Sequence, residues 1–414
     1  MNKRTGNGII VVIALCCIGL LPVSAVQAAK IGKNSCGGTA VPNAFCSFEG
    51  TGEVTIGNDS CNVEGACTNI ADGVKIGSNA CNGEEACNDL GVAGGEAMIG
   101  NDSCNGYEAC ENAGDNGHAS IGSNSCNSYE ACYYAGEDGR ASIGKGACNG
   151  YEACEEAGYG GDATVGDGSC LGYEACYYAA GGSSGMGGTV EIAKGACKGT
   201  YACYELGYEG DAVIGQGSCI GYDACDDAAY YGQATIGKGS CVEGYETCYY
   251  AGYYGQAVIA DKSCKNDYAC YETAYESGTS LEVGTGSCIG YEACCYAAYY
   301  SSAQAVIGKG SCAGNDYACY YLAGYGSATI GDKSCNGYDA CDDVANKTGV
   351  TTTIGKQSCN GYDACYQAGD DYSSSIGSGS CNNYESCYEV GHSTAETVGD
   401  KQCNEAQECS NETI

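Results

Sequence analysis

The chain has almost none of the residues that ordinarily fill a globular core. Its 414 residues include 2 Phe, 3 Met, 2 Pro and no Trp, against 69 Gly, 37 Cys and 37 Tyr. Much of the 44% that counts as hydrophobic is therefore thiol and phenol rather than aliphatic side chain. A large Leu/Phe core is excluded, so the chain needs another source of cohesion.

Basic residues are also scarce. The chain has 17 Lys and Arg against 52 Asp and Glu, which gives a formal net charge of −35. A nucleic-acid-binding protein needs a basic footprint because it has to neutralise phosphates, so nucleic acid is excluded as a partner. A negative charge of this size favours solubility and attracts cations.

No catalytic motif is present in the sequence. The two histidines, His118 and His392, lie in variable segments, and there is neither a phosphate-binding Gly-rich motif nor a nucleophile elbow. We therefore predict that the protein is not an enzyme and that it needs no cofactor.

Residues 1–28 have the layout of a secretory signal peptide. Lys3 and Arg4 precede an apolar run, and small residues follow it near Ala28. The run of 13 apolar residues is shorter than the roughly 20 that a membrane anchor requires, and the C-terminus lacks the hydrophobic tail of a lipid-anchor signal. We expect cleavage near Ala28 or Ala29, a mature domain of residues 29–414, and a secreted, extracellular protein without a membrane anchor.

One unit of about 23 residues repeats from residue 31 to the end of the chain. It consists of I-G-x-x-S-C-N-G-Y-E-A-C followed by a variable stretch, and a unit with so few aliphatic residues must stack on its neighbours to bury a face. The pattern predicts a mainly β, elongated, single-domain repeat solenoid of about 17 coils, stapled by disulfides. The anchoring aliphatic residues are Ile31, Ile56, Ile76, Ile99, Ile121, Ile143, Val165, Ile192, Ile214, Ile236, Ile259, Val283, Ile307, Ile330, Ile354, Ile376 and Val398.

The strand of each coil is expected to end at this anchor, because small and β-branched residues precede it. Gly follows the anchor in 15 of 17 units, with Ala193 and Ala260 as the exceptions, and this predicts a sharp corner with an unusual backbone angle.

Helix is disfavoured by the abundance of Gly and Tyr. The Gly- and Ser-rich stretch 181–188 is expected to bulge from its coil as a loop.

The unit resembles the BspA-like leucine-rich repeats, whose pattern I-G-x-x-A-F-x-G-C-x-x-L has about the same length. In the unit that starts at Ile121, Cys126 stands where that family has a buried Phe, and Cys132 where it has a buried Leu. The sequence departs from the family by lacking a later V-x-I-P strand and by carrying Cys at core positions. The resemblance implies a surface or secreted adhesive and recognition scaffold rather than an enzyme.

The cysteines fall in pairs. After Cys16 and Cys17 leave with the signal peptide, 35 remain, and all but one fall as two per unit, usually six residues apart. Such pairing in a secreted chain indicates disulfides, whereas zinc sites use the closer C-x-x-C spacing. We favour bonds within a unit, while bonds between stacked coils, ~4.8 Å apart, stay open. Pairs of the favoured kind are Cys104/Cys110, Cys126/Cys132, Cys148/Cys154 and Cys359/Cys365.

Cys295 is the odd cysteine. The register of the repeat makes Cys294 the paired residue, so Cys295 is expected to be unpaired, capped or bridged to another molecule. Self-association through Cys295 or through tyrosines is one alternative for a partner.

Stacking turns equivalent positions into columns, and two columns lie between the cysteines of their units. The tyrosine column, a candidate binding surface, comprises Tyr107, Tyr129, Tyr151, Tyr173, Tyr222, Tyr291, Tyr338, Tyr362 and Tyr384. The acid column, a candidate cation site, comprises Glu108, Glu130, Glu152, Glu174, Asp223, Glu292, Asp339, Asp363 and Glu385. The rings either cover the disulfides or present an aromatic face to glycans, minerals or oxidants.

Carboxylates at coil spacing repel by about 0.9 kcal/mol per pair in water, which favours bound cations. Calcium is the candidate because it accepts oxygen ligands flexibly, although no known calcium loop is present.

Asparagine follows the first Cys of many units and is expected to satisfy backbone groups at the turn. Glycosylation sequons occur at Asn58, Asn101, Asn346 and Asn411.

Together these patterns predict a secreted structural or adhesive protein of an extracellular matrix or cell coat. Its partners would be matrix, glycan or surface components that contact the tyrosine and acid columns. A soluble module that recognises a glycan or protein is the alternative. Ice binding is a third hypothesis, which Lys75, Met98 and Glu191 weaken because they interrupt the column before the anchor.

Overall fold

The computed structural model of the chain describes residues 29–37 and 45–409, apart from short gaps at 178, 181–187, 205, 208–210, 227, 229–232, 250, 255, 274–279, 296, 298–303, 321, 324–325 and 346. The predicted signal peptide, nearly all of the expected loop at 181–188, and the sequons at Asn346 and Asn411 lie outside the described residues.

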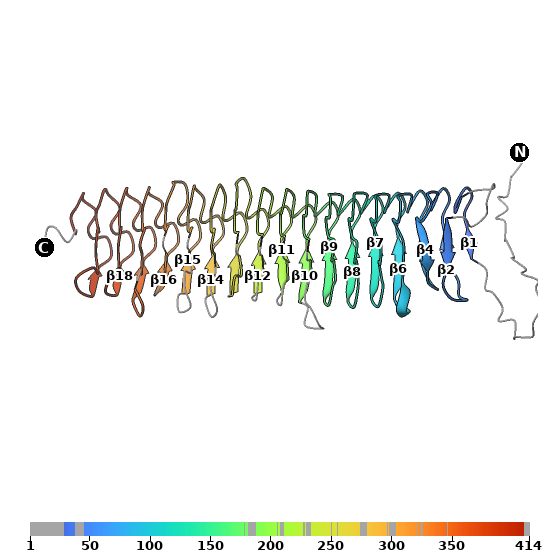
Figure 1. Cartoon of the computed structure of the whole chain (residues 1–414). Helices are drawn as coiled ribbons and strands as arrows, with labels where there is room; N and C mark the ends of the chain where they lie inside the picture. The colour runs from blue at the N-terminus through green and yellow to red at the C-terminus, as the bar shows by residue number, and fades with distance from the viewer. Residues whose placement is uncertain are drawn as a thin grey trace, which may run out of the picture.

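The chain folds into a long parallel β-solenoid, with the first and last coils at opposite ends of a rod (Figure 1). A 17-stranded sheet runs along the rod, and each of its strands pairs with the strand of the next coil. The mainly β solenoid of about 17 coils that the repeat predicts is confirmed. The sheet contains β1 (Lys30–Ile31), β3 (Thr55–Ile56), β5 (Lys75–Ile76), β6 (Glu96–Ile99), β7 (His118–Ile121), β8 (Arg140–Ile143), β9 (Asp162–Val165), β10 (Thr189–Ile192), β11 (Ala212–Ile214), β12 (Gln233–Ile236), β13 (Gln256–Ile259), β14 (Ser280–Val283), β15 (Gln304–Ile307), β16 (Ser327–Ile330), β17 (Thr351–Ile354), β18 (Ser374–Ile376) and β19 (Glu396–Val398).

Little other regular structure occurs in the described residues. Two short strands, β2 (Cys46–Phe48) and β4 (Cys67–Ile70), form a separate pair near the N-terminal end. A single 3₁₀ turn, η1, covers Val92–Gly94, and no α-helix is found in the part of the chain that the structure describes.

The anchors lie opposite one another in the sheet. Ile121 pairs with Ile99 on one side and Ile143 on the other, so each strand ends at its anchor, as predicted. Because side chains alternate between the two faces of a strand, the anchor and the residue two before it point inward. The outward positions, such as Ser120 in β7, are exposed.

The core consists of columns of small residues. In one coil Ala119, Ile121, Cys126, Ala131 and Cys132 are all less than 5% exposed, and the other coils repeat the arrangement. The chain therefore fills its interior with Ile, Ala and disulfide sulfur, which accounts for the missing Leu and Phe.

The Gly after each anchor is explained by close packing between coils. A Cβ on Gly122 would lie 2.7 Å from the carbonyl carbon of Gly144 in the next coil, a distance that real Cβ contacts do not show. The left-handed φ comes two residues later, at Asn124 (58°) and Gly146 (67°). The prediction of an unusual backbone angle at the Gly directly after the anchor is therefore wrong. The left-handed φ two residues later explains why Asn, Asp and Gly are common at that later position.

A ladder of buried serines runs through the coils beside the sheet. The Ser240 hydroxyl donates to the carbonyl oxygen of Ala260 in the next coil at 2.8 Å and accepts the N–H of Ser263 at 3.1 Å. Ser263 repeats the pattern with Gly284. Buried polar groups need partners, and each hydroxyl finds two. The fully buried members are Ser60, Ser103, Ser125, Ser169, Ser218, Ser240, Ser263, Ser287, Ser311, Ser334, Ser358 and Ser380.

The last coil ends the serine ladder with a glutamine. In the coil before it, the N–H of Gly377 donates to the anchor carbonyl of Val398 at 2.8 Å. Gly399 has no following described coil, and its N–H donates instead to Oε1 of Gln402 at 2.9 Å. The N–H of Gln402 reaches Oγ of Ser380 at 3.1 Å. Gln402 thus caps a backbone donor that the end of a sheet would otherwise expose.

We expect Ser240→Ala to weaken the junction between two coils. The change leaves the N–H of Ser263 and the carbonyl of Ala260 without their side-chain partner, and an unsatisfied buried group costs about 1–3 kcal/mol. The Ser263 amide should then exchange with solvent roughly ten-fold faster or more in native-state hydrogen exchange. Ser142→Ala, on the exposed face of the sheet, is the control and should change nothing. Equal protection in both variants would show that the ladder does not stabilise the stack.

Candidate functional site: the tyrosine and acid columns

The structure pairs the cysteines within each coil. The Cα atoms of Cys104 and Cys110 lie 5.6 Å apart, and those of Cys126 and Cys132 lie 5.8 Å apart. The pairs Cys148–Cys154 and Cys359–Cys365 are bonded in the same way. No bond between coils occurs among the described cysteines. From Cys104–Cys110 to Cys381–Cys387, each bridge closes the turn that carries the tyrosine of its coil.

This turn has an unfavourable backbone that the disulfide holds in place. In one coil the φ angles of Cys126, Glu130 and Cys132 are 52°, 47° and 66°, all in the left-handed region. Such residues cost about 1 kcal/mol or more each unless the surroundings fix them. The bridge and the stacked neighbours supply that constraint, so the side chains between the cysteines project from a rigid frame.

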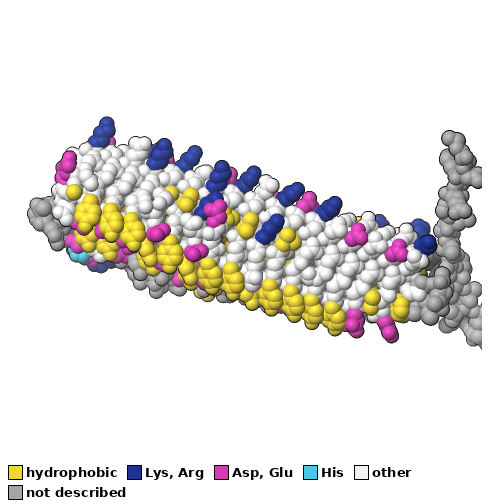
Figure 2. Space-filling model, turned by 90° about the horizontal axis from the view of Figure 1, so that it is seen from above, with side chains coloured by type: hydrophobic (Ala, Val, Ile, Leu, Met, Phe, Trp, Pro, Cys, Tyr) yellow, Lys and Arg dark blue, Asp and Glu magenta, His cyan; other side chains and the backbone are white. Residues whose placement is uncertain are grey.

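The tyrosines form an unbroken row along one edge of the rod. The ring centroids of Tyr107, Tyr129, Tyr151 and Tyr173 are 5.2, 4.8 and 5.1 Å apart in succession, and the rings lie nearly parallel. Figure 2 shows the side-chain class that includes Tyr as a continuous row along one long edge. The row continues with centroid distances of 5.0–6.0 Å through Tyr201, Tyr222, Tyr245, Tyr268, Tyr291, Tyr317, Tyr338, Tyr362 and Tyr384.

Four members of this row were missed by counting from the anchor: Tyr201, Tyr245, Tyr268 and Tyr317. Three of them, all but Tyr245, stand two residues before the second Cys of their coil, where other coils carry the acid. Tyr268 accordingly shares the left-handed φ of Glu292, 57° against 53°. Its ring meets its neighbours edge-on rather than stacked. Searching both two and three residues before the second Cys would have found all four.

The predicted acids all lie in the same turns, beside the tyrosine row. The N–H of Glu130 donates to the carbonyl of Tyr107 in the preceding coil at 2.9 Å, and Glu152 does the same to Tyr129. Glu85 and Glu246 belong to the column as well, with φ of 54° and 49°. Tyr takes the position of the acid in three coils, and in two of these an aspartate, Asp267 or Asp316, stands directly before it, so the column of carboxylates is offset there rather than straight.

Hydrogen bonds couple the two columns. The bond between Tyr129 and Glu130, with desolvation and the charge of Glu130, raises the pKa of Tyr129 to about 12. Glu246 and Glu292 act in the same way on Tyr245 and Tyr291, whose pKa values also rise to about 12. A phenol that donates to a carboxylate resists losing its proton, because the phenolate would face a like charge.

Several carboxyl groups of the column are also shifted. Desolvation, followed by the charge of Glu246, raises the pKa of Asp223 to about 6. Desolvation also raises the pKa of Asp363 to about 6, with further contributions from Asp339 and Glu385. The pKa of Glu385 itself is lowered, chiefly by a hydrogen bond from Gln407. Desolvation is the main cause of the two raised pKa values, and the like charges of the neighbouring coils add to it.

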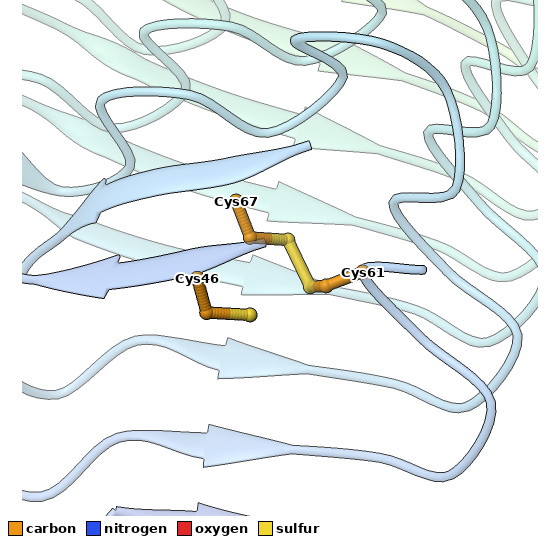
Figure 3. A group of neighbouring side chains, drawn as sticks. All are labelled: Cys46, Cys61 and Cys67. Carbon is orange, nitrogen blue, oxygen red and sulfur yellow. A yellow bond between two sulfur atoms is a disulfide. The ribbon is translucent and has the colours of Figure 1, made fainter. Parts of the chain in front are cut away.

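Groups of cysteine sulfurs lie close enough together to suggest a metal site. The sulfurs of Cys46, Cys61 and Cys67 lie within 4.8 Å of one another. Figure 3 shows the disulfide between Cys61 and Cys67, and Cys46 is bonded to Cys36. A metal needs thiolates as ligands, so this group gives no support to zinc. Oxygen ligands for a cation would have to come from the acid column.

Cys295 is a free cysteine, and it is 4% exposed. Burial raises the pKa of its thiol, and nearby carboxylates add to the shift. Its carbonyl accepts the N–H of Glu272 at 2.9 Å. This burial argues against the intermolecular bridge that we considered, because the thiol is out of reach of another molecule.

The asparagines after the first Cys bond between coils, as predicted. Oδ1 of Asn105 accepts the N–H of Asn82 at 3.0 Å, and its Nδ2 donates to the carbonyl of Asn79. In the middle coils, where Asn is replaced, direct β-bridges such as that of Lys198 with Ile220 take over.

The two sequons within the described residues lie on the surface. Asn58 and Asn101 are exposed, and their Oδ1 atoms accept the backbone N–H groups of Lys33 and Ser78 in the preceding coils. Glycosylation at these residues stays a prediction.

Comparisons with known proteins give one match. The family model described as Domain of unknown function (DUF7640) matches residues 12–117, 90–160, 115–209, 185–317 and 273–357. The stretches overlap because a model that spans several coils aligns with a repeat in more than one register. No curated protein and no solved structure matches the chain. In the described part of the chain, no helix has the length and apolar character needed to cross a membrane.

We expect Glu130→Gln to lower the pKa of Tyr129 from about 12 toward the ordinary value of 10. A raised phenol pKa stabilises the fold below pH 10, and this contribution is lost as the pH rises through 12. The measurement is an alkaline NMR titration of ¹³C-labelled tyrosine. Glu49→Gln, an exposed change outside the column, serves as the control. An unchanged Tyr129 midpoint in Glu130→Gln would contradict the coupling of the two columns.

Proposed function

We propose that this chain, which belongs to the DUF7640 family, is a secreted, non-catalytic structural or adhesive protein of an extracellular matrix or cell coat. The observation that carries the proposal is the continuous row of tyrosines from Tyr107 to Tyr384, whose end members are 38% and 46% exposed. This row and the neighbouring acids would be the contact surface.

The chemistry of the row suits an extended partner. Each ring offers an apolar face and a polar hydroxyl, and the row repeats these groups once per coil. A contiguous exposed aromatic surface of this kind is typical of an interaction site. The row runs along the rod instead of enclosing one point, so it fits a polymer chain or a flat surface better than a compact ligand. Glycans and mineral faces are the partner classes that match.

The frame behind the row supports a mechanical role. The disulfide in each coil and the serine ladder fix the spacing of the rings without help from a ligand. Disulfides at this density form in oxidising compartments such as the extracellular space, in agreement with the predicted signal peptide. The resemblance to BspA-like repeats also implies an adhesive scaffold, and we carry it forward as part of the proposal.

A soluble recognition module is the second candidate. The replacement of the acid by Tyr201, Tyr268 and Tyr317 makes the edge non-uniform along its length, and such a pattern would let one partner bind in one place. Ice binding has weaker support, because Lys75, Met98 and Glu191 are exposed within the outward column of the sheet.

Extraction of the protein from its source tests the structural role. We expect most of it to stay with the insoluble fraction in hot detergent without reductant, because repeated contacts along the row add up. Ready release as a soluble monomer with and without reductant would contradict the proposal and favour the recognition module.

A variant of the row shows whether tyrosine makes the contact. Replacing Tyr129, Tyr151 and Tyr173 by Ser should lower binding of the purified protein to that insoluble fraction at least ten-fold, since each aromatic contact contributes about 1 kcal/mol. Val213→Ser with Val258→Ser removes exposed apolar side chains from the sheet face and is the matched control. Equal losses in the two variants would assign binding to general hydrophobicity.

We also propose that the acid column binds divalent cations, with calcium as the candidate. Binding should be weak below pH 6 and strong above it, because the carboxyl groups of Asp223 and Asp363 ionise near pH 6. Terbium luminescence excited through the neighbouring tyrosines measures it, with displacement by calcium. Asp339→Asn with Asp363→Asn should reduce the signal, whereas Glu64→Gln, outside the column, should not. Absence of sensitised emission at pH 8 would refute the cation site.

A further inference from the structure

Lysines gather in the turn that follows the anchor. In the coils from residue 145 to 356 this turn carries seven of them, all exposed, which we call the lysine edge. Figure 2 shows a row of Lys and Arg side chains along one long edge of the rod, with the aromatic-containing row along the opposite edge of the same face. The members of the lysine edge are Lys145, Lys194, Lys238, Lys262, Lys309, Lys333 and Lys356.

Most of these ammonium groups have no acidic partner within the described rod. The same turns contain three acids, Asp167, Asp261 and Asp332, and Oδ1 of each accepts a backbone N–H from a lysine of the preceding coil at 2.7–3.0 Å. Among the described residues, Lys356 alone of the seven forms an ion pair, with Asp332 at 3.0 Å. The lysine edge is therefore a net positive stripe on a strongly negative protein.

The opposite edge carries the complementary charge over the same coils. It presents seven members of the acid column next to the tyrosine row, with Asp267 and Asp316 in two further turns, and we call the row and these acids together the tyrosine–acid edge. The seven members are Glu152, Glu174, Asp223, Glu246, Glu292, Asp339 and Asp363.

We propose that the rods associate side by side, with the lysine edge of one copy lying on the tyrosine–acid edge of the next. The inference rests on the proposed function and names a second copy of this chain as a partner of that surface. An ammonium group can pair with a carboxylate or lie over the face of a tyrosine ring. Between the cysteines of these coils the opposite edge offers a tyrosine in every turn and a carboxylate in every turn but that of Tyr201.

The repeat makes the two edges match along their length. Both have the period of one coil, ~4.8 Å, so a lysine that faces an acid in one coil brings the lysines of the other coils opposite equivalent turns. The coils of Val165, Ile214 and Val283 carry no lysine in this turn. A copy displaced by a whole coil still fits. Because the two edges are different and lie on opposite sides of one face, each rod can bind one neighbour on each side. Such a contact does not close into a ring, and it produces a flat layer of parallel rods.

The net charge predicts an unusual dependence on salt. With a formal charge of −35 for the whole chain, two rods repel at low ionic strength. At about 0.15 M salt the Debye length falls to about 8 Å, which screens distant charges but leaves contact pairs effective. At about 1 M, where it is about 3 Å, the contact pairs weaken as well. Association should therefore be strongest at intermediate salt.

Sedimentation velocity of the purified, disulfide-bonded protein over this salt range tests the proposal. We expect the wild type to associate at intermediate salt. Lys238→Glu, Lys262→Glu and Lys309→Glu together should weaken association at least ten-fold. The control changes the same number of cations on the outer face of the sheet, with Lys30→Glu, Lys75→Glu and Arg140→Glu, and should behave like the wild type apart from added repulsion.

A charge swap distinguishes the contact from general electrostatics. Glu152→Lys, Glu174→Lys and Glu292→Lys together should also prevent self-association, and a mixture of this variant with the lysine-edge variant should associate again at least ten-fold more strongly than either alone. A wild type that is monomeric at every salt concentration, or a mixture that fails to associate, would overturn the proposal. Matrix binding that persists in the lysine-edge variant and is lost in the tyrosine variant would leave the proposed function standing.

Discussion

The parallel pairing of successive coils sets the conditions for every other feature of the rod. Ile121 lies between Ile99 and Ile143, and the backbones at Gly122 and Gly144 approach too closely for side chains between them. This contact fixes the register, so each position of the repeat becomes a column with one neighbour above and one below. A residue type that recurs at one position of the repeat therefore forms a ladder along the rod. Its hydrogen bonds, ring stacking or charge repulsion recur in every coil.

Cysteine and serine stabilise this core in place of the Leu and Phe of an ordinary core. The left-handed angles of Cys126 and Cys132 allow a tight turn that a large side chain could not pack behind, and the disulfide holds that turn closed. The Ser240 hydroxyl then joins its coil to the next with one donated and one accepted bond. Stability comes from constraints within each coil and bonds between neighbours, which is the pattern expected of a solenoid.

The sequence predicts the features that follow from period alone. The anchors predict where the strands end, and the asparagines after the first Cys predict hydrogen bonds to the backbone. Both predictions need only one recognisable residue in each coil. It does not predict the row through Tyr201, Tyr268 and Tyr317, since these residues lie one or two positions further from their anchors than the other tyrosines. Connectivity of the cysteines was open because spacings within and between coils both permit a bridge. The Ser240 column is visible as the Ser of the repeat pattern, but its buried ladder is not predicted, since a small polar residue suits a turn as well as a buried ladder.

The surface shows how a stack of identical coils limits the repulsion that repetition creates. An acid in each coil would place like charges at strand spacing along the whole rod. The raised pKa of Asp363, about 6, is caused first by desolvation and then by that repulsion. Tyr268 and Tyr317 interrupt the line at positions where the backbone keeps the same left-handed angle. In these two coils the acid is not lost but stands one position earlier, at Asp267 and Asp316, so the carboxylate is offset within the turn without a change of the coil. Phenol rings that meet their neighbours edge-on continue the row through these coils, so aromatic contact extends over the length of the edge while the line of carboxylates is offset there.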